Sequence, residues 1–274
     1  MKIDLHTHTS MSDGSLSPLE LVKQAELASI DILSITDHDN VNAYDDIKKL
    51  KSSKMTVTPG IEFSSEWGKL GIHIVGLNIQ LDSDAMRTAV DSQSRARLLR
   101  AQRIAEQLDK LGLENSWEGV QEIAAGGVIG RPHFAQLLIK NGVVKDFKQA
   151  FRKYLGAGKA GDIKQYWAPY QQIIEWIRDA NGIAVLAHPK KYKLTRTKLV
   201  KLVDDFCAAG GESIEVISGN QTDDVTRILS KLCQQKDMFA SCGSDFHHPG
   251  QAWCELGKVP PLPAGCKAIW ENWH

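Results

Sequence analysis

The stretch that decides the fold is the N-terminal segment MKIDLHTHTSMSDGS, residues 1–15. Its first residues alternate polar and apolar side chains, which is typical of a short strand. His6 and His8 follow at once, two residues apart, so their rings point to the same side of an extended backbone. Asp13, which forms a predicted turn with Gly14, can bring a carboxylate back towards them. Two imidazoles and a carboxylate at the end of a strand form half of a metal site, and the other half must come from elsewhere in the chain.

Length and charge limit the classes of protein to which the chain can belong. With 274 residues, 42% of them hydrophobic, it can bury the core of one large α/β barrel or of two modest domains. The 33 lysines and arginines balance 33 aspartates and glutamates. A neutral protein has no overall field that draws it to nucleic acid or to an anionic membrane, so any attraction for phosphate must be local.

The sequence favours a cytoplasmic protein with no membrane contact, and it suggests no stable protein partner. No apolar run approaches the length of a bilayer span, and the first residues lack the order of a signal peptide. The cysteines are odd in number and form no CxxC pair, which is typical of buried reduced thiols. They all lie in the last third of the chain: Cys207, Cys233, Cys242, Cys254 and Cys266.

Strands and helices alternate at both ends of the chain, which predicts parallel βα units. The first helix begins at a capping box, Ser17 to Glu20, with a proline at its first position. Helices are predicted at residues 18–28, 42–51, 195–209 and 222–235, and strands at residues 30–35, 55–58, 72–77, 183–187, 213–217 and 238–242.

The middle of the chain has a different pattern. Residues 83–111 predict a long helix, and short helical segments separated by glycines follow. No clear strand is predicted between about residue 85 and residue 180. We therefore expect a discontinuous α/β barrel, made of residues 1–84 and 180–274, with a helical insertion at residues 85–179.

Potential metal ligands recur directly after the predicted strands, where the functional groups of parallel α/β proteins gather. A single histidine in apolar surroundings is usually structural, but burying so many unpaired polar groups would be very costly unless metal ions bind them. Their number exceeds one tetrahedral site and predicts two or three metals with a carboxylate bridge. The residues are His6, His8, Asp13, His38, Glu62, His188, Asp245 and His247, with His73 near a strand start and His133 at a helix start.

Eight short motifs contain these residues and follow one another along almost the whole chain. They are His6-Thr7-His8, Asp13-Gly14, Thr36-Asp37-His38-Asp39, Pro59-Gly60-Ile61-Glu62, His73, Arg131-Pro132-His133, Ala187-His188-Pro189 and Gly243-Ser244-Asp245-Phe246-His247. Together they resemble the PHP (polymerase and histidinol phosphatase) family. Within the family, the helical insertion and the chain length are similar to those of one group. That group includes 3′,5′-nucleoside bisphosphate phosphatases and a 5′→3′ exoribonuclease that acts on short RNA. The resemblance implies a distorted (β/α)7 barrel of the TIM type with a small helical insertion domain.

The resemblance also implies divalent metals as cofactors, two or three per chain. Manganese is favoured, with iron or zinc as alternatives, because mixed imidazole and carboxylate ligands do not choose among these ions. Glu62 would bridge two of them. The implied ligand sets are His6, His8, Glu62 and Asp245 for one metal, Asp13, His38 and His247 for a second, and Glu62, His73 and His133 for a third.

The implied reaction is hydrolysis of a phosphate ester in a small nucleotide or at the 5′ end of short RNA. A hydroxide that bridges the metals attacks phosphorus in line. Arg131 would neutralise phosphate oxygens, unless it is a structural arginine. His188 would contact a metal or the phosphate, and it is one candidate for the proton donor to the leaving group. Lys159, in a glycine-rich loop, can reach a second phosphate or remain a solvated lysine.

Two further groups of residues have a structural explanation as well as a functional one. Basic residues on the long helix can guide a polyanion or form a solvated face. Aromatic residues can stack on a base or pack in a core. The basic residues are Arg95, Arg97, Arg100 and Arg103, and the aromatic ones are Tyr166, Trp167 and Tyr192.

Two rival functions remain open. The first is a PHP phosphatase for histidinol phosphate or another small metabolite. The second is a metal-stabilised accessory module without activity, like the PHP domains attached to DNA polymerases. The chain has no polymerase region, and an inactive module is expected to have lost ligands, so an active phosphoesterase is favoured.

Overall fold

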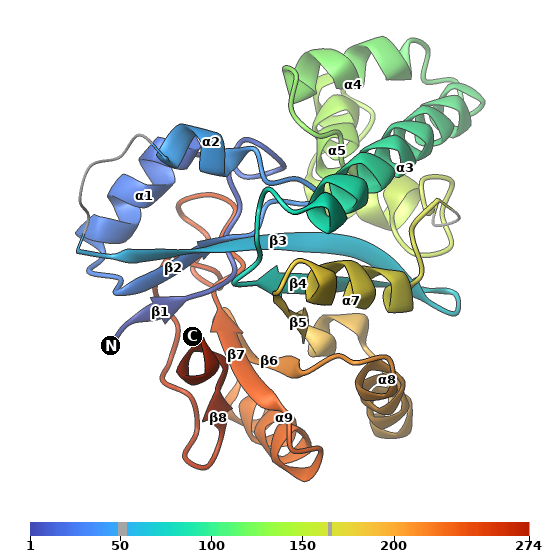
Figure 1. Ribbon diagram of the computed structural model, residues 1–274. Helices are drawn as coiled ribbons and strands as arrows, with labels where there is room; N and C mark the ends of the chain where they lie inside the picture. Colours follow the sequence, from blue (N-terminus) through green and yellow to red (C-terminus); the bar gives the residue numbers. More distant parts are fainter. Residues whose placement is uncertain (49–53, 164–165, 274) are drawn as a thin grey trace. The chain divides into compact units, whose positions relative to one another are not determined.

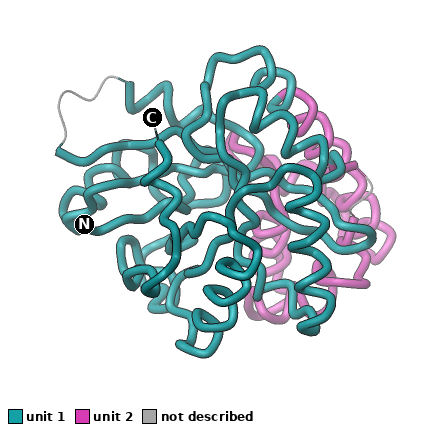
Figure 2. The backbone as a smooth tube through the Cα atoms, turned by 60° about the horizontal axis from the view of Figure 1, so that its bottom comes forward, with its two compact units in different colours: residues 1–90, 168–274 teal, residues 91–167 magenta. Residues whose placement is uncertain are grey.

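The computed structural model describes residues 1–48, 54–163 and 166–273. The chain forms two compact units, which Figure 2 shows in different colours. Unit 1 comprises residues 1–90 and 168–274, and unit 2 comprises residues 91–167. The insertion expected at residues 85–179 is longer than unit 2, because α7 (Tyr170–Asp179) packs on strands of unit 1.

Unit 1 is built on one curled sheet, in which the strands follow one another in sequence order (Figure 1). The sheet curls far enough to bring β1 beside β7, where the Leu5 N–H donates to the Cys242 carbonyl at 3.1 Å. The fold class expected from the sequence is confirmed. The strands are β1 (Ile3–Asp4), β2 (Ile32–Ile35), β3 (Thr56–Trp67), β4 (Leu70–Leu77), β5 (Ile183–Leu186), β6 (Ser213–Ser218), β7 (Phe239–Gly243) and β8 (Lys267–Ala268).

The sheet is mixed, so the parallel pairing expected of βα units does not extend to the two pairs that β4 forms. β3 pairs with β4, and β4 with β5, in antiparallel fashion. β3 also continues to Trp67, although the sequence predicts its end at Thr58. Gly60 looks like a turn residue, but it lies inside the strand. A glycine is needed there because a Cβ would be 2.3 Å from Ser34 Oγ. Glu62 therefore projects from the middle of a strand instead of following one.

The helices of unit 1 lie close to the predicted positions. The capping box at Ser17 is confirmed, since its hydroxyl accepts from the Glu20 N–H and the Glu20 side chain accepts from the Ser17 N–H. The helix predicted at residues 42–51 is α2, and residues 49–51 lie outside the described part of the chain. The further elements are α1 (Pro18–Leu27), α2 (Ala43–Ile47), η2 (Pro189–Tyr192), α8 (Arg196–Ala208), α9 (Asp223–Gln235) and η3 (Ile269–Asn272).

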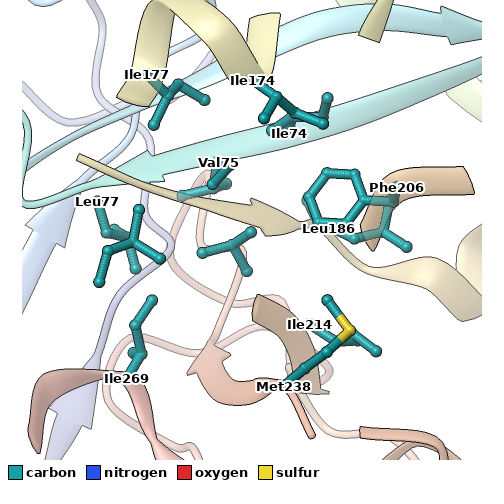
Figure 3. Packing of buried hydrophobic residues seen from close by; sticks show 14 of the residues in the cluster. Ile74, Val75, Leu77, Ile174, Ile177, Leu186, Phe206, Ile214, Met238 and Ile269 are labelled. Carbon is teal, nitrogen blue, oxygen red and sulfur yellow. The ribbon is translucent and has the colours of Figure 1, made fainter. Parts of the chain in front are cut away.

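The main core of unit 1 lies between the sheet and its covering helices (Figure 3). Val75 and Leu186 of the sheet, Ile174 of α7 and Phe206 of α8 belong to this cluster and are buried. Burying each such side chain contributes about 1.5–3 kcal/mol. This core holds in place the strands that carry the histidines or lead to them.

Unit 2 is helical and has its own core. No strand occurs among its described residues, as predicted. Ile104, Leu108, Phe134 and Leu138 are buried together. In the described part of the chain, no helix combines the length and the apolar composition that crossing a bilayer requires. The elements are α3 (Asp84–Asp109), whose start belongs to unit 1, α4 (Ser116–Ala124), α5 (Arg131–Lys140), α6 (Phe147–Ala150) and η1 (Phe151–Leu155).

Candidate metal centre

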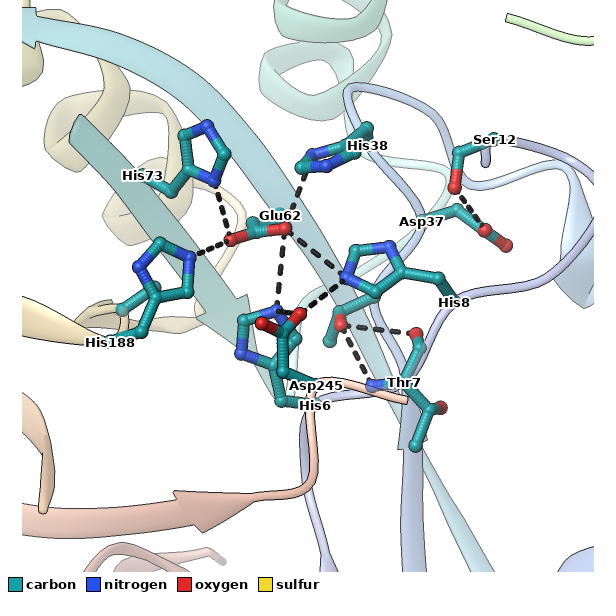
Figure 4. A network of polar contacts seen from close by, with 12 residues as sticks. His6, Thr7, His8, Ser12, Asp37, His38, Glu62, His73, His188 and Asp245 are labelled. Carbon is teal, nitrogen blue, oxygen red and sulfur yellow. Dashed lines mark hydrogen bonds and ion pairs between the residues drawn. The ribbon is translucent and has the colours of Figure 1, made fainter. Parts of the chain in front are cut away.

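Glu62 is the centre of a histidine cluster in unit 1 (Figure 4). Its side chain is 1% exposed. One carboxylate oxygen lies 2.8 Å from His73 Nδ1 and 2.9 Å from His188 Nε2. The other oxygen faces three rings, at His6 Nε2 (3.3 Å), His8 Nε2 (3.3 Å) and His38 Nδ1 (3.1 Å). A carboxylate with imidazoles around both oxygens has the arrangement that a bridging metal ligand needs.

Two further carboxylates complete the cluster on either side of His8. Asp245 Oδ1 lies 3.4 Å from His8 Nε2 and 3.5 Å from His6 Nε2. Asp13 Oδ1 lies 3.3 Å from His247 Nε2 and 3.9 Å from His8 Nδ1. The turn at residues 13 and 14 thus brings its carboxylate back to the strand end, as the sequence predicts.

The backbone around the cluster is held by neighbouring strands. Thr7, between the two N-terminal histidines, forms a parallel bridge with Phe246, and its hydroxyl donates to the Ser34 carbonyl at 2.8 Å. His188 (φ 29°) and Asp245 (φ 56°) adopt left-handed backbone conformations, which residues other than glycine rarely do. Such conformations concentrate at functional sites, where the surrounding structure holds them.

Several ring nitrogens of the cluster fit a metal-binding role. His6 Nε2, both nitrogens of His8 and His188 Nδ1 are buried without a hydrogen-bond partner among the described residues. Leaving such atoms unsatisfied is costly, and metal ions would satisfy them. Four groups of possible ligands have donor atoms within 4.8 Å of one another: His8, Asp13, His38 and His247; His6, Glu62 and His188; His6, His8 and Asp245; and His38, Glu62 and His73.

Burial and charge act against each other in this cluster. Burial by itself would lower the pKa of His6, but the negative charges of Glu62 and Glu215 raise it to about 10. Burial by itself would raise the pKa of Glu62, but the surrounding histidines hold it well below its usual range. Burial lowers the pKa of His188 to about 4. The His188 ring is therefore neutral at pH 7, which suits a metal ligand better than a proton donor.

Glu215, the carboxylate behind His6, is not among the site residues predicted from the sequence. It lies in β6, is 2% exposed, and faces His6 Nδ1 at 2.9 Å while it accepts from the His188 N–H at 2.5 Å. A carboxylate that accepts from Nδ1 leaves Nε2 as the ligand atom, the usual arrangement behind a metal-bound histidine. The available signal was a single charged residue in an otherwise apolar or small-residue strand.

Asp37 is a second residue whose role is not predicted from the sequence, although it belongs to the motif that contains His38. Its carboxylate accepts from the Thr9 N–H at 2.7 Å, the Thr9 hydroxyl at 2.5 Å and the Ser12 hydroxyl at 2.6 Å. These three bonds tie the loop that carries Asp13 to the end of β2. Asp37 therefore positions the loop and leaves metal binding to its neighbour His38.

Arg131, His133 and Lys159 belong to unit 2. Arg131 Nη1 donates to the Leu155 carbonyl at 3.4 Å, and burial lowers the pKa of its guanidinium. His133 Nδ1 accepts from the Gly130 N–H at 3.0 Å. Lys159 is exposed, and its N–H donates to the Gly156 carbonyl. Their roles at a metal centre stay predictions.

The arginines of α3 do not form one solvated face. Arg97 and Arg100 are only 7% exposed, and their guanidinium carbons lie 5.3 and 5.0 Å from the centre of the Trp167 ring. Tyr192 supports the cluster instead of facing solvent for a base, because its hydroxyl accepts from the His73 N–H and donates to the Ala187 carbonyl, each at 2.8 Å. Of the two alternatives for these arginines, the solvated face is therefore wrong for Arg97 and Arg100.

Comparisons with known proteins identify the family of the chain. The PHP domain matches residues 4–182 of the chain. A 5′-3′ exoribonuclease Rnm from Salmonella typhimurium is 39% identical over 99% of this chain and 93% of its own length. A 3′,5′-nucleoside bisphosphate phosphatase from Chromobacterium violaceum is 36% identical over 98% of this chain and 95% of its own.

A solved structure from Chromobacterium violaceum, described as an amidohydrolase with bound sulfate and no metal, has a TM-score of 0.91 and 35% identity. It matches 100% of this chain and 96% of its own. The family match covers well over half of the sequence, and the relatives are similar over nearly their full lengths. The chain belongs to the PHP family.

Proposed function

We propose that the chain is a metal-dependent phosphoesterase that hydrolyses 3′,5′-bisphosphonucleotides, the 5′-phosphorylated ends of short RNA, or both. The observation that carries the proposal is the buried cluster around Glu62, with histidines on both carboxylate oxygens. The similarity to an exoribonuclease and to a nucleoside bisphosphate phosphatase supports the substrate class and the class of hydrolase that the sequence predicts.

The proposed cofactors are two or three divalent ions, with manganese favoured over iron or zinc. When bound, such ions polarise a phosphate and lower the pKa of a water molecule, which supplies a nucleophile at neutral pH. The geometry supports His6, His8 and Asp245 in one set, and Asp13, His38 and His247 in a second set that His8 also approaches. Glu62 and His73 form part of a third set, for which the sequence also predicts His133.

The chain's own residues orient the site. Glu62 holds both sides of the cluster together, and Glu215 keeps the Nδ1 proton of His6 directed away from the ligand atoms. His188, neutral at pH 7, adds a ring nitrogen beside Glu62. Arg131 is proposed to bind the substrate phosphate, because its planar guanidinium matches two phosphate oxygens.

A panel of substrates tests the proposal. Chelator-treated protein reloaded with Mn²⁺ is given adenosine 3′,5′-bisphosphate, AMP, histidinol phosphate and a short 5′-phosphorylated RNA, and phosphate or nucleotide release is measured. We expect the bisphosphate or the RNA to have the highest kcat/KM, and chelator to abolish turnover. A preference for histidinol phosphate would favour a metabolite phosphatase. No turnover on any substrate by metal-loaded protein would favour an accessory module.

A further inference from the structure

Lys191 places an ammonium group at the edge of the metal centre. It lies in η2, directly after β5, and its Nζ pairs with Asp245 Oδ2. The lysine side chain is 55% exposed, whereas that of Asp245 is 8% exposed. The pair therefore joins the buried cluster to solvent.

The two oxygens of Asp245 have separate partners. Oδ1 faces His6 Nε2 and His8 Nε2, the nitrogens of one candidate metal set, whereas Oδ2 meets Lys191. A metal bound through Oδ1 would leave the contact between Oδ2 and Lys191 in place. Lys191 and a metal do not compete for the same oxygen in this arrangement.

The backbone of Lys191 is anchored on both neighbouring strands. Its N–H donates to the His188 carbonyl at 2.9 Å. The next residue, Tyr192, uses its hydroxyl to join the His73 N–H on β4 to the Ala187 carbonyl after β5. The ammonium group is therefore carried by a fixed backbone rather than by a long loop.

Lys191 also differs from the other cations of unit 1. Among the described residues of that unit, it is the one lysine or arginine whose side chain pairs with Asp13, Glu62 or Asp245, and histidines supply the other pairs. An ammonium group has three N–H donors. One of them meets Asp245, and the remaining two can bind oxygens of an anion that arrives from solvent.

We propose that Lys191 binds a non-bridging oxygen of the phosphate that the centre hydrolyses. This inference rests on the proposed phosphoesterase function and adds a substrate-binding residue to it. Lysine is a point charge that suits a phosphate oxygen, and a charge-assisted contact of this kind is among the stronger hydrogen bonds. Asp245 acts through its two oxygens, with one directed to the ligand cluster and the other holding the ammonium group beside it.

The alternative is a structural role, in which Lys191 only neutralises Asp245. The test compares Lys191→Met, which removes the charge, with Lys191→Arg, which keeps it. Lys190→Met, a change in the preceding residue of the same short helix, is the matched control. Metal content after Mn²⁺ loading, binding of inorganic phosphate by calorimetry and kcat/KM on adenosine 3′,5′-bisphosphate are measured for each protein, with circular dichroism to verify the fold.

We expect Lys191→Met to keep its metal, to bind inorganic phosphate more weakly and to lose about 10- to 100-fold in kcat/KM. Lys191→Arg should recover part of both losses, and Lys190→Met should stay within about twofold of the unchanged protein. Phosphate binding and kcat/KM within twofold in Lys191→Met would overturn the proposal, and loss of metal there would assign the structural role. If the unchanged protein hydrolyses nothing, the proposed function fails, while the phosphate titrations still decide whether Lys191 binds the anion.

Discussion

Replacing Glu215 by glutamine should weaken metal binding far more than the small change in shape suggests. In the structure one carboxylate oxygen faces His6 Nδ1 at 2.9 Å and the other accepts from the His188 N–H at 2.5 Å. Glutamine has only one oxygen. The backbone N–H of His188 can only donate, so the amide oxygen must remain there and the amide NH2 must face His6.

That placement forces His6 into the wrong tautomer. Nδ1 must then accept from the amide, so the proton of the neutral ring moves to Nε2, the atom that faces Glu62 and Asp245. A protonated nitrogen cannot ligate a metal. Loss of a partner behind a ligand histidine costs about 10- to 100-fold in metal affinity, which corresponds to roughly 1.4–2.8 kcal/mol.

The assay is competition for Mn²⁺ against a chelator of known affinity, combined with metal analysis of the purified protein. Glu212→Gln is the matched control, because it makes the same change at an exposed position directly before the same strand. Mn²⁺ affinity of Glu215→Gln within twofold of the unchanged protein would refute the tautomer argument. Glu215→Ala should also lose stability, because it leaves the buried His188 N–H unsatisfied.

Three more predictions concern other predicted site residues. Glu62→Gln should keep the fold and lose several orders of magnitude in turnover, and near-normal activity would assign the bridge to another residue. Arg131→Ala should keep its metal and lose at least about 10-fold in kcat/KM. His133→Ala should lose both metal and activity. Equal metal loss in the two variants would make Arg131 a structural residue. Chelator-treated protein should become less stable to urea as the pH rises from 7 to 10. The fold raises the pKa of His6 to about 10, so the folded protein loses this proton, and the stability linked to it, over that pH range. Constant stability from pH 7 to pH 10 would contradict the raised pKa.

The Arg131 and His133 comparison has a further physical basis. His133 Nδ1 accepts from the Gly130 N–H at 3.0 Å, which assigns the proton of the neutral ring to Nε2. Binding a metal through Nδ1 would replace that hydrogen bond, and binding through Nε2 would require a change of tautomer. If His133→Ala keeps all of its metal, the ring acts as a hydrogen-bond donor and is not the third ligand of its set.

Much of unit 1 could be predicted because local signals and buried strands agree. The capping box at Ser17 and the apolar strands around β2, β5 and β6 give boundaries close to those observed. The antiparallel pairing of β3 with β4 could not be predicted in the same way. Pro59 and Gly60 resemble a turn, but Gly60 is required by the close approach of Ser34 and Thr36, a contact between strands that leaves no local pattern.

The candidate ligands were easier to predict than the residues that support them. Histidines and carboxylates after strands form a visible pattern, and their convergence follows from sheet geometry. Lys191 has no such signal, since two lysines stand side by side and only the three-dimensional structure shows which one meets Asp245. Glu215 and Asp37 act through hydrogen bonds to distant backbone, and such partners depend on the register between strands.

The charges of His6, Glu62 and Glu215 explain how the cluster can assemble before a metal binds. Buried carboxylates would be very costly alone. The charges of Glu62 and Glu215 outweigh burial and raise the pKa of His6 to about 10, so we expect its ring to carry a proton at pH 7 in the metal-free chain. That proton supplies positive charge at the candidate metal set of His6, His8 and Asp245. A metal ion that binds there can then replace the proton. Manganese binding at pH 7 should therefore release a proton from His6, while His188, whose pKa is about 4, releases none. The Mn²⁺ affinity should accordingly rise from pH 6 to pH 8, and calorimetry in buffers of different ionisation enthalpy measures the proton directly. Binding without proton release would show that His6 is already neutral in the metal-free chain, and the charge balance proposed for the cluster would have to be abandoned.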